Sequence, residues 1–166
     1  MMSPEWYSLD QGLLAVIQAH QEVAPIRLSA IAHALGVKVI ATAMPSGISG
    51  EIRPDADNPG QYIIRVNKND SSRRQRFTVA HELGHFLLHR AQIGDGITDD
   101  VLYRSELSDR REAQANRIAA DLLMPQQLVD EWLDKARALK VDNVIGFLAD
   151  KFNVSEAAMK IRLGIP

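Results

Sequence analysis

The sequence of 166 residues predicts an α+β fold, because helical spacing at both ends flanks a group of short strand-like runs. Apolar residues three and four apart predict one helix between about 9 and 22 and another over 26–35, ended by a glycine. Three runs enriched in β-branched residues follow at 37–41, 47–53 and 62–66. A small three-stranded sheet between helical regions is therefore expected.

The first long helix of the second half begins after the third predicted strand. Asp70 or Ser71 provides its N-cap, and the apolar periodicity continues to about His89. Residues 91–107 contain two glycines and several acids without any clear period. This stretch is predicted to be an irregular loop.

A second long helix is predicted to begin near Ser108 or Asp109 and to end before Pro125. Two or three shorter helices follow, the last of them opening at Ser155. A chain of roughly 150 residues can bury about 70% of its unfolded surface. Residues 1–166 are accordingly predicted to form a single domain.

Composition excludes several classes of function. The net charge of −2 and the 5% aromatic content give no basis for strong nucleic-acid binding. Cysteine is absent, which removes disulfides and thiolate metal ligands and suits a reducing compartment. The apolar run over 13–17 is too short to cross a membrane and lacks a basic flank. A cytoplasmic protein without membrane association is expected.

The chemically informative motif is His81-Glu82-Leu83-Gly84-His85, an HExxH sequence inside a predicted helix. With about 3.6 residues per turn, His81 and His85 face the same way and can bind one zinc ion together. Glu82 borders that position and is suited to act as the general base toward a water molecule. The alternative is a pair of histidines that are solvated or satisfied within the core.

Two histidines leave a zinc site incomplete, so a third protein ligand is required. His89 lies eight residues beyond His81, which is about 12 Å along a helix and too far to bind the same ion. It is instead predicted to be an exposed histidine at the helix end, or alternatively a group that supports the site.

Glu112 is the favoured third ligand. It begins an apolar stripe on the second long helix, and a buried carboxylate is costly unless it is paired or binds metal. The alternative makes Glu112 the partner of Asp109 in a capping box. Asn116, one turn further, could orient a ligating histidine through its second ring nitrogen or could be an ordinary buried amide.

The loop before this helix supplies weaker candidates. Four acids there are secondary candidates for metal binding: Asp95, Asp99, Asp100 and Glu106. Stabilisation of an oxyanion by His89, Tyr103 or Arg104 is possible on sequence grounds, with no basis for choosing among them. The strand at 62–66 is a candidate to bind substrate as an added β-strand.

Two long motifs resemble the ImmA/IrrE family of bacterial metallopeptidases. They are RQRFTVAHELGHFLLH from Arg74 to His89 and EAQANRIAADLLMP from Glu112 to Pro125, and the strand at 63–67 also matches the family habit. The family commonly has a second acid two places before the asparagine, where this chain has Gln114. The role of that acid is therefore not carried over to this chain.

The resemblance implies a thermolysin-like core with one Zn²⁺ per chain, bound by His81, His85 and Glu112, and with Glu82 as the catalytic base. It also implies a substrate, an Xre-type helix-turn-helix repressor cut at one site so that repressed genes are released. In some members the chain is instead the toxin component of a toxin–antitoxin pair with such a regulator. A purely structural zinc site is a further alternative, which predicts a closed tetrahedral set of ligands.

Overall fold

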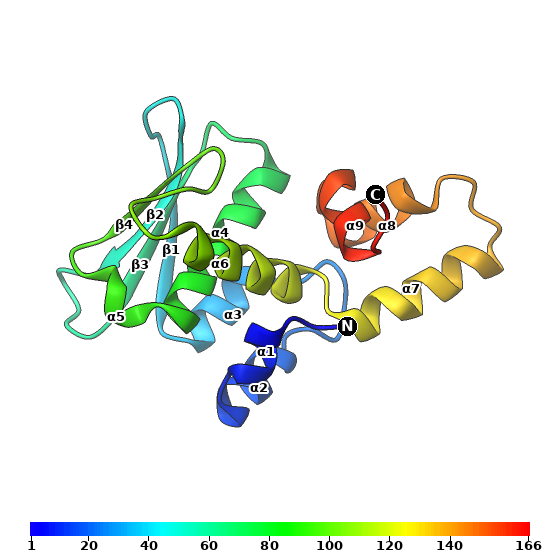
Figure 1. Cartoon of the computed structure of the whole chain (residues 1–166), viewed down its shortest axis with the longest axis horizontal. Helices are drawn as coiled ribbons and strands as arrows, with labels where there is room; N and C mark the ends of the chain where they lie inside the picture. The colour runs from blue at the N-terminus through cyan, green and yellow to red at the C-terminus, as the bar shows by residue number, and fades with distance from the viewer.

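The computed structural model describes residues 1–166 and has an α+β architecture, in which a mixed four-stranded sheet is flanked by helices (Figure 1). The strand order is β1-β3-β2-β4, with β1 parallel to β3 and the other two pairs antiparallel. The strands are β1 (Val37–Thr42), β2 (Ile48–Pro54), β3 (Tyr62–Asn67) and β4 (Ile97–Asp100). The predicted fold class is confirmed.

The sheet has one strand more than predicted. The three expected strands are present, but β4 lies within the stretch 91–107 that was predicted to be an irregular loop. That prediction was wrong because β4 has only four residues, two of them acidic, and aspartate is depleted in strands. Its strand character comes from antiparallel pairing with β2, which is remote in sequence.

The chain also forms nine helices. They are α1 (Pro4–Ser8), α2 (Gln11–Gln18), α3 (Leu28–Ala34), α4 (Ser72–Leu88), α5 (Arg90–Ile93), α6 (Asp109–Leu123), α7 (Gln126–Ala138), α8 (Val144–Phe152) and α9 (Glu156–Arg162). Serine side chains cap α4, α6 and α9 at Ser71, Ser108 and Ser155, so the structure selects the serine where the sequence had left Asp70 or Ser71 and Ser108 or Asp109 open. None of these helices is long and apolar enough to cross a membrane.

The N-terminal helix differs from the prediction. The helix expected between about 9 and 22 is the shorter α2, which begins after Asp10 because that carboxylate accepts hydrogen bonds from the N–H groups of Gly12 and Leu13. The short helix α1, which precedes it, was not predicted. The end of α3 is as predicted, with Gly36 at a φ of 75°.

Helix α4 lies between the sheet and α6 and contacts both (Figure 1). The approach to α6 depends on Gly84, where an added Cβ would lie 2.9 Å from the carbonyl oxygen of Ala115. The two backbones are thus nearly in contact at the HExxH motif. This close approach lets side chains of α6 reach the histidines of α4.

One buried apolar cluster extends from Trp6 in α1 to Met159 in α9 and includes residues from the sheet. The C-terminal helices are further tied to the rest by Arg76, whose guanidinium donates to the carbonyls of Ile26, Phe152 and Asn153. Both ends of the chain therefore pack on the framework that carries the HExxH motif.

Candidate metal centre

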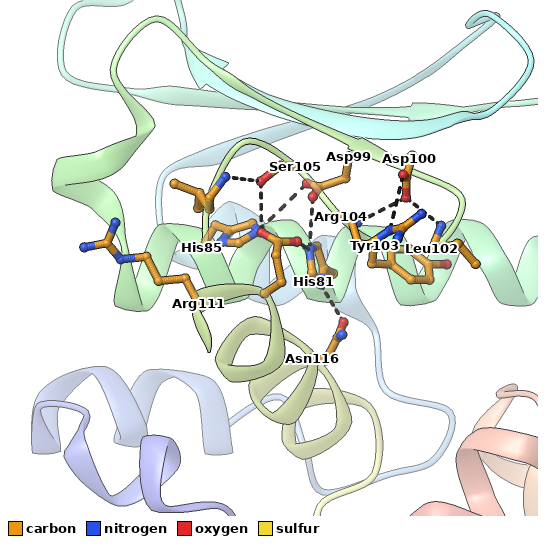
Figure 2. A network of polar contacts seen from close by, with 12 residues as sticks. His81, His85, Asp99, Asp100, Leu102, Tyr103, Arg104, Ser105, Arg111 and Asn116 are labelled. Atoms are coloured by element: carbon orange, nitrogen blue, oxygen red, sulfur yellow. Dashed lines mark hydrogen bonds and ion pairs between the residues drawn. The ribbon is translucent and has the colours of Figure 1, made fainter. Parts of the chain in front are cut away.

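The two motif histidines occupy the buried face of α4, one turn apart. Both side chains are fully buried, and their Nε2 atoms lie 3.1 Å from each other. Figure 2 shows the two rings side by side between the sheet and α6. The spacing inferred from helical geometry thus brings both imidazoles to one point.

Glu112 brings a carboxylate from α6 to the same point. Its Oε2 lies 3.2 Å from Nε2 of His81, and its Oε1 lies 3.0 Å from Nε2 of His85. The capping-box alternative is wrong, because Ser108 caps α6 and the Glu112 carboxylate points to the histidines. Ser105 Oγ also donates to Glu112 Oε1 at 3.1 Å.

Asp99 completes the cluster from the opposite side. Its Oδ1 lies 3.4 Å from Nε2 of His81 and its Oδ2 lies 3.9 Å from Nε2 of His85. In Figure 2 the Asp99 side chain descends from the sheet toward the two rings. The other acids of this stretch do not join it, since Asp95 and Glu106 are exposed and Asp100 accepts hydrogen bonds from its own loop.

Asn116 contacts the far side of the His81 ring. Its Oδ1 lies 2.8 Å from His81 Nδ1, so an N–H at Nδ1 can donate to the amide oxygen (Figure 2). This fixes the tautomer in which Nε2 keeps its lone pair toward the acidic cluster. The contact favours the orienting alternative over an ordinary buried amide.

His89 occupies the corresponding place beside His85, and the prediction that it is exposed was wrong. It is 4% exposed, and its Nδ1 lies 3.0 Å from His85 Nδ1. Its Nε2 can donate to Gln114 Oε1 at 2.8 Å, which leaves Nδ1 to accept from His85. Gln114 thus supports the site through His89, a role that its amide oxygen performs without a negative charge.

The alternative in which His89 supports the site is thus the one that the structure favours, and the sequence contained a signal for it. His85 and His89 are four residues apart, and side chains at that spacing are neighbours on a helix. That spacing brings His89 to His85, although His89 lies too far along the helix from His81 to bind the same ion. Asp99 was one of four secondary candidates in the predicted loop, and nothing local in the sequence separated it from the other three, because its position depends on the pairing of β4.

Glu82 is fully buried next to this cluster, and neither of its carboxylate oxygens has a hydrogen-bond partner. Burial is the main cause that raises the pKa of Glu82 well above its usual value, and the nearby Asp99 carboxylate raises it further. A carboxyl group in this state has a high affinity for a proton. That is the property a general base at this position requires.

The charges of the cluster perturb the other members as well. Burial alone would lower the pKa of His81, but the neighbouring Asp99 and Glu112 carboxylates raise it to about 9. Burial would raise the pKa of Glu112, yet the neighbouring His81 and His85, which can donate to its carboxylate when they are protonated, hold that pKa far below its usual range. Without a metal, a proton on His81 therefore balances part of the negative charge of the Asp99 and Glu112 carboxylates.

The donor set fits a divalent cation. His81, His85, Asp99 and Glu112 each offer a ligand atom within 4.8 Å of the others. Both oxygens of Asp99 and Oε2 of Glu112 are buried without a hydrogen-bond partner. Buried carboxylates without partners are costly unless a cation compensates them, and imidazole with carboxylate suits zinc and related metals.

The three side chains considered for stabilising an oxyanion differ in their positions and contacts. Arg104 is exposed and pairs with Asp100, whereas His89 is engaged with His85 and Gln114. The ring of Tyr103 lies 5.3 Å from that of His81, and its hydroxyl is 3.4 Å from Thr78 Oγ1. Of the three, Tyr103 is the one beside the cluster.

A helix with two buried histidines one turn apart and an intervening glutamate, crossed by a second helix that adds a carboxylate, is the arrangement typical of an HExxH metallopeptidase. The chain belongs to the peptidase family described as IrrE N-terminal-like domain, whose model matches residues 32–164. This confirms the family resemblance drawn from the two long motifs.

Two named proteins are similar in sequence to this chain. The chain is 38% identical over 103 residues to the radiation response metalloprotease IrrE of Deinococcus deserti, an alignment covering 57% of this chain and 32% of that protein. It is 32% identical over 95 residues to the metallopeptidase ImmA of Bacillus subtilis, covering 57% of this chain and 50% of that one. The matched region thus spans a third to a half of these relatives.

A similar fold occurs in a solved structure described as a Mycobacterium tuberculosis transcriptional regulator. The TM-score is 0.54 at 19% identity, and the match covers 95% of this chain and 48% of that one. At this identity the likeness concerns the fold. It includes nearly the whole of the present chain, from the N-terminal helices to the C-terminal ones.

Proposed function

We propose that residues 1–166 act as a single-domain zinc endopeptidase, which cuts an Xre-type helix-turn-helix regulator in the cytoplasm at one site and so relieves repression. The observation that carries the proposal is Glu82, a fully buried carboxylate without a hydrogen-bond partner beside two metal-binding histidines. A structural metal site has no use for such a group, whereas hydrolysis requires a base at this position.

His81, His85 and Glu112 would bind the zinc ion. When bound, zinc lowers the pKa of water toward about 7 and polarises the carbonyl of the scissile bond. Asn116 and the relay of His89 and Gln114 fix the histidine tautomers that direct both Nε2 lone pairs inward. The contribution of these outer groups is orientation.

Glu82 would take a proton from the attacking water and deliver it to the nitrogen of the departing amine. Its raised pKa favours the first transfer, because the buried carboxylate gains stability when it is protonated. Tyr103 is the side chain we assign to the developing oxyanion, since its ring lies beside His81.

The substrate strand is proposed to pair with β4. The sequence-based hypothesis assigned this role to the strand at 62–66, but β3 is paired on both sides, with β1 and β2, and has no free edge. In contrast, β4 pairs only with β2 and stands at the edge of the sheet, and its residue Asp99 contacts the histidines of α4. An exposed edge can accept an extended peptide through backbone hydrogen bonds.

A regulatory partner is supported by what the chain resembles. Relatives include the metallopeptidase ImmA and, at 28% identity over 102 residues, a protein of Bacillus phage phi105 named for an immunity region. The fold is shared with a protein described as a transcriptional regulator. The Xre-type class of substrate itself comes from the family resemblance of the two long motifs.

The test is cleavage of the Xre-type regulator encoded beside this gene, by the zinc-loaded chain and by its Glu82→Gln variant. We expect cleavage to fall by a factor of about 10² or more, with bound zinc unchanged at one per chain. Glu106→Gln, the same change at an exposed loop position, is the matched control and should cleave normally.

Two results would contradict the proposal. Cleavage by Glu82→Gln at the wild-type rate would remove the proposed base. A full biological effect of the uncleaving variant would instead indicate that the chain acts by binding, as expected for the toxin component of a toxin–antitoxin pair.

A further inference from the structure

Asp99 is a buried acid that the proposed reaction does not use. Its side chain is 0% exposed, while the preceding Thr98 on β4 faces solvent, as alternation along a strand requires. Both carboxylate oxygens lack any hydrogen-bond partner. A buried charged group requires a cation close by, and Oδ1 of Asp99 lies 3.4 Å from Nε2 of His81 in the metal cluster.

The distances place Asp99 where a fourth ligand belongs. Two ligands that bind one tetrahedral zinc ion at about 2.0 Å are separated by about 3.3 Å. The Nε2 atoms of His81 and His85 are 3.1 Å apart, and Glu112 oxygens lie 3.2 and 3.0 Å from them. Oδ1 of Asp99 lies 3.4 Å from Nε2 of His81 and Oδ2 lies 3.9 Å from Nε2 of His85, so the Asp99 carboxylate is within reach of an ion bound by the other three residues.

This arrangement conflicts with the usual requirement of a catalytic site. Catalytic zinc has three protein ligands and reserves the fourth position for water or substrate, whereas four protein ligands are typical of closed, structural sites. A closed set is also what the structural-zinc alternative predicts. The partnerless Glu82 carboxylate beside the cluster nevertheless indicates that hydrolysis takes place there.

We propose that Asp99 is a displaceable fourth ligand, which closes the metal site at rest and leaves when a substrate carbonyl or another ligand takes its position. This inference rests on the proposed peptidase function. It assigns latency to the chain itself, so that cleavage requires a partner able to displace Asp99. A substrate strand that pairs along β4 approaches the metal beside the residue it must displace.

The backbone around Asp99 supports its role as the ligand that leaves. β4 is a four-residue edge strand paired only with β2, and its register is irregular between Ile48 and Gly50, where Gly50 faces Asp99. Gly94 and Gly96, with φ of 54° and 149°, precede the strand. The other carboxylate, Glu112, is on the 15-residue helix α6, which packs closely on α4.

The competing interpretation is that Asp99 shares a proton with Glu82 and does not bind metal. The two interpretations differ in what surrounds the ion, which can be measured without any peptidase assay. Cobalt(II) in place of zinc provides that measurement, since its visible absorption depends on the number and kind of its ligands.

The experiment compares the cobalt-loaded full chain with its Asp99→Asn variant, using acetohydroxamate as a small metal-binding probe. We expect the variant to show a changed cobalt spectrum and to bind acetohydroxamate at least tenfold more tightly. At saturating probe, both proteins should give the same spectrum, because Asp99 has left the metal in each. Asp95→Asn, the same change at an exposed position of the same segment, should behave as wild type.

An unchanged spectrum and an unchanged hydroxamate affinity in Asp99→Asn would overturn the assignment. If the variant does not fold, a crystal structure of the zinc-loaded wild type decides the question. An Asp99 oxygen at about 2.0–2.2 Å from zinc supports the proposal, and a water there with Asp99 turned away refutes it. Failure of the peptidase function would appear instead as an uncleaved regulator, with these metal-ligand results unaffected.

Discussion

Helix α6 has a buried carboxylate near each end, and the two carboxylates differ in the partners that surround them. Near its C-terminus, Asp121 is 0% exposed and accepts hydrogen bonds from Ser3 Oγ at 2.5 Å and from Arg162 at 3.0 Å. Near its N-terminus, Glu112 meets two histidines and two further acids, and three of the four carboxylate oxygens of Glu112 and Asp99 have no hydrogen-bond partner.

The difference shows which end is structural. At Asp121 the compensating cation is Arg162 of α9, which also donates to the carbonyl of Met124. The N–H of Ser3 donates to the same Asp121 carboxylate, so both terminal segments of the chain contact the C-terminal end of α6. At Glu112 no lysine or arginine balances the acids, and the histidines compensate only when protonated. We therefore expect the first site to determine stability, and the second to depend on metal and pH.

The largest effect is expected from Asp121→Ala, which leaves the guanidinium of Arg162 buried without its partner. Removing one member of a buried ion pair costs about 3–5 kcal/mol, so the free energy of unfolding should fall by that amount. Urea unfolding of metal-free and zinc-loaded protein measures it. The loss should be equal in the two forms, and a loss of less than 1 kcal/mol would show that this end contributes little.

The metal end should respond to pH when zinc is removed. The pKa of His81 is raised to about 9 from 6.5, so its contribution is fully present below pH 6.5 and is lost as the pH rises through 9. This corresponds to about 3 kcal/mol of unfolding free energy. Glu82, whose pKa is raised, acts in the same direction, while Glu112, whose pKa is lowered, stays ionised throughout this window.

The measurement is chemical denaturation of chelator-treated protein at several pH values between 6 and 10. Zinc-loaded protein is the control, because metal replaces the proton on the histidine and should remove most of the slope. A metal-free protein that is equally stable at both ends of this range would contradict the assigned ion pairs.

Local signals in the sequence predicted much of this site. The caps at Ser71 and Ser108 and the spacing of His81 and His85 concern residues within a few turns of each other, where helical geometry is decisive. The burial of Glu112 followed from the periodicity of its own helix. The faces of α4 and α6 that carry these residues are the faces with which the two helices pack on each other.

What could not be predicted depends on pairing between remote segments. β4 has no strand signal of its own, and it exists because it pairs with β2, about 50 residues earlier in the chain. Asp99 therefore looked like one loop acid among four. Likewise, the pairing of Asp121 with Arg162 joins residues of α6 and α9 that no spacing rule relates.

A smaller effect is expected from Glu112→Gln, which keeps the size of the side chain and removes its charge. Structural zinc is bound with about 10–16 kcal/mol over four ligands, so weakening one ligand should cost roughly 3 kcal/mol, or about 100-fold in zinc affinity. Competition with a chelator measures this. Glu106→Gln is the exposed control, and full affinity in Glu112→Gln would exclude Glu112 as a ligand.

The smallest effect is expected at a second ion pair of the same chemical kind. Arg73 and Asp150 approach to 2.6 Å, closer than the 3.0 Å between Arg162 and Asp121, but their side chains are 37% and 77% exposed. Water already solvates both charges, so breaking this pair leaves nothing buried without a partner. Asp150→Ala should change the unfolding free energy by about 0.5 kcal/mol or less, measured by the same urea titration. A loss comparable to that of Asp121→Ala would mean that distance determines the contribution of these pairs, and the contrast between the two ends of α6 would then need another cause than burial.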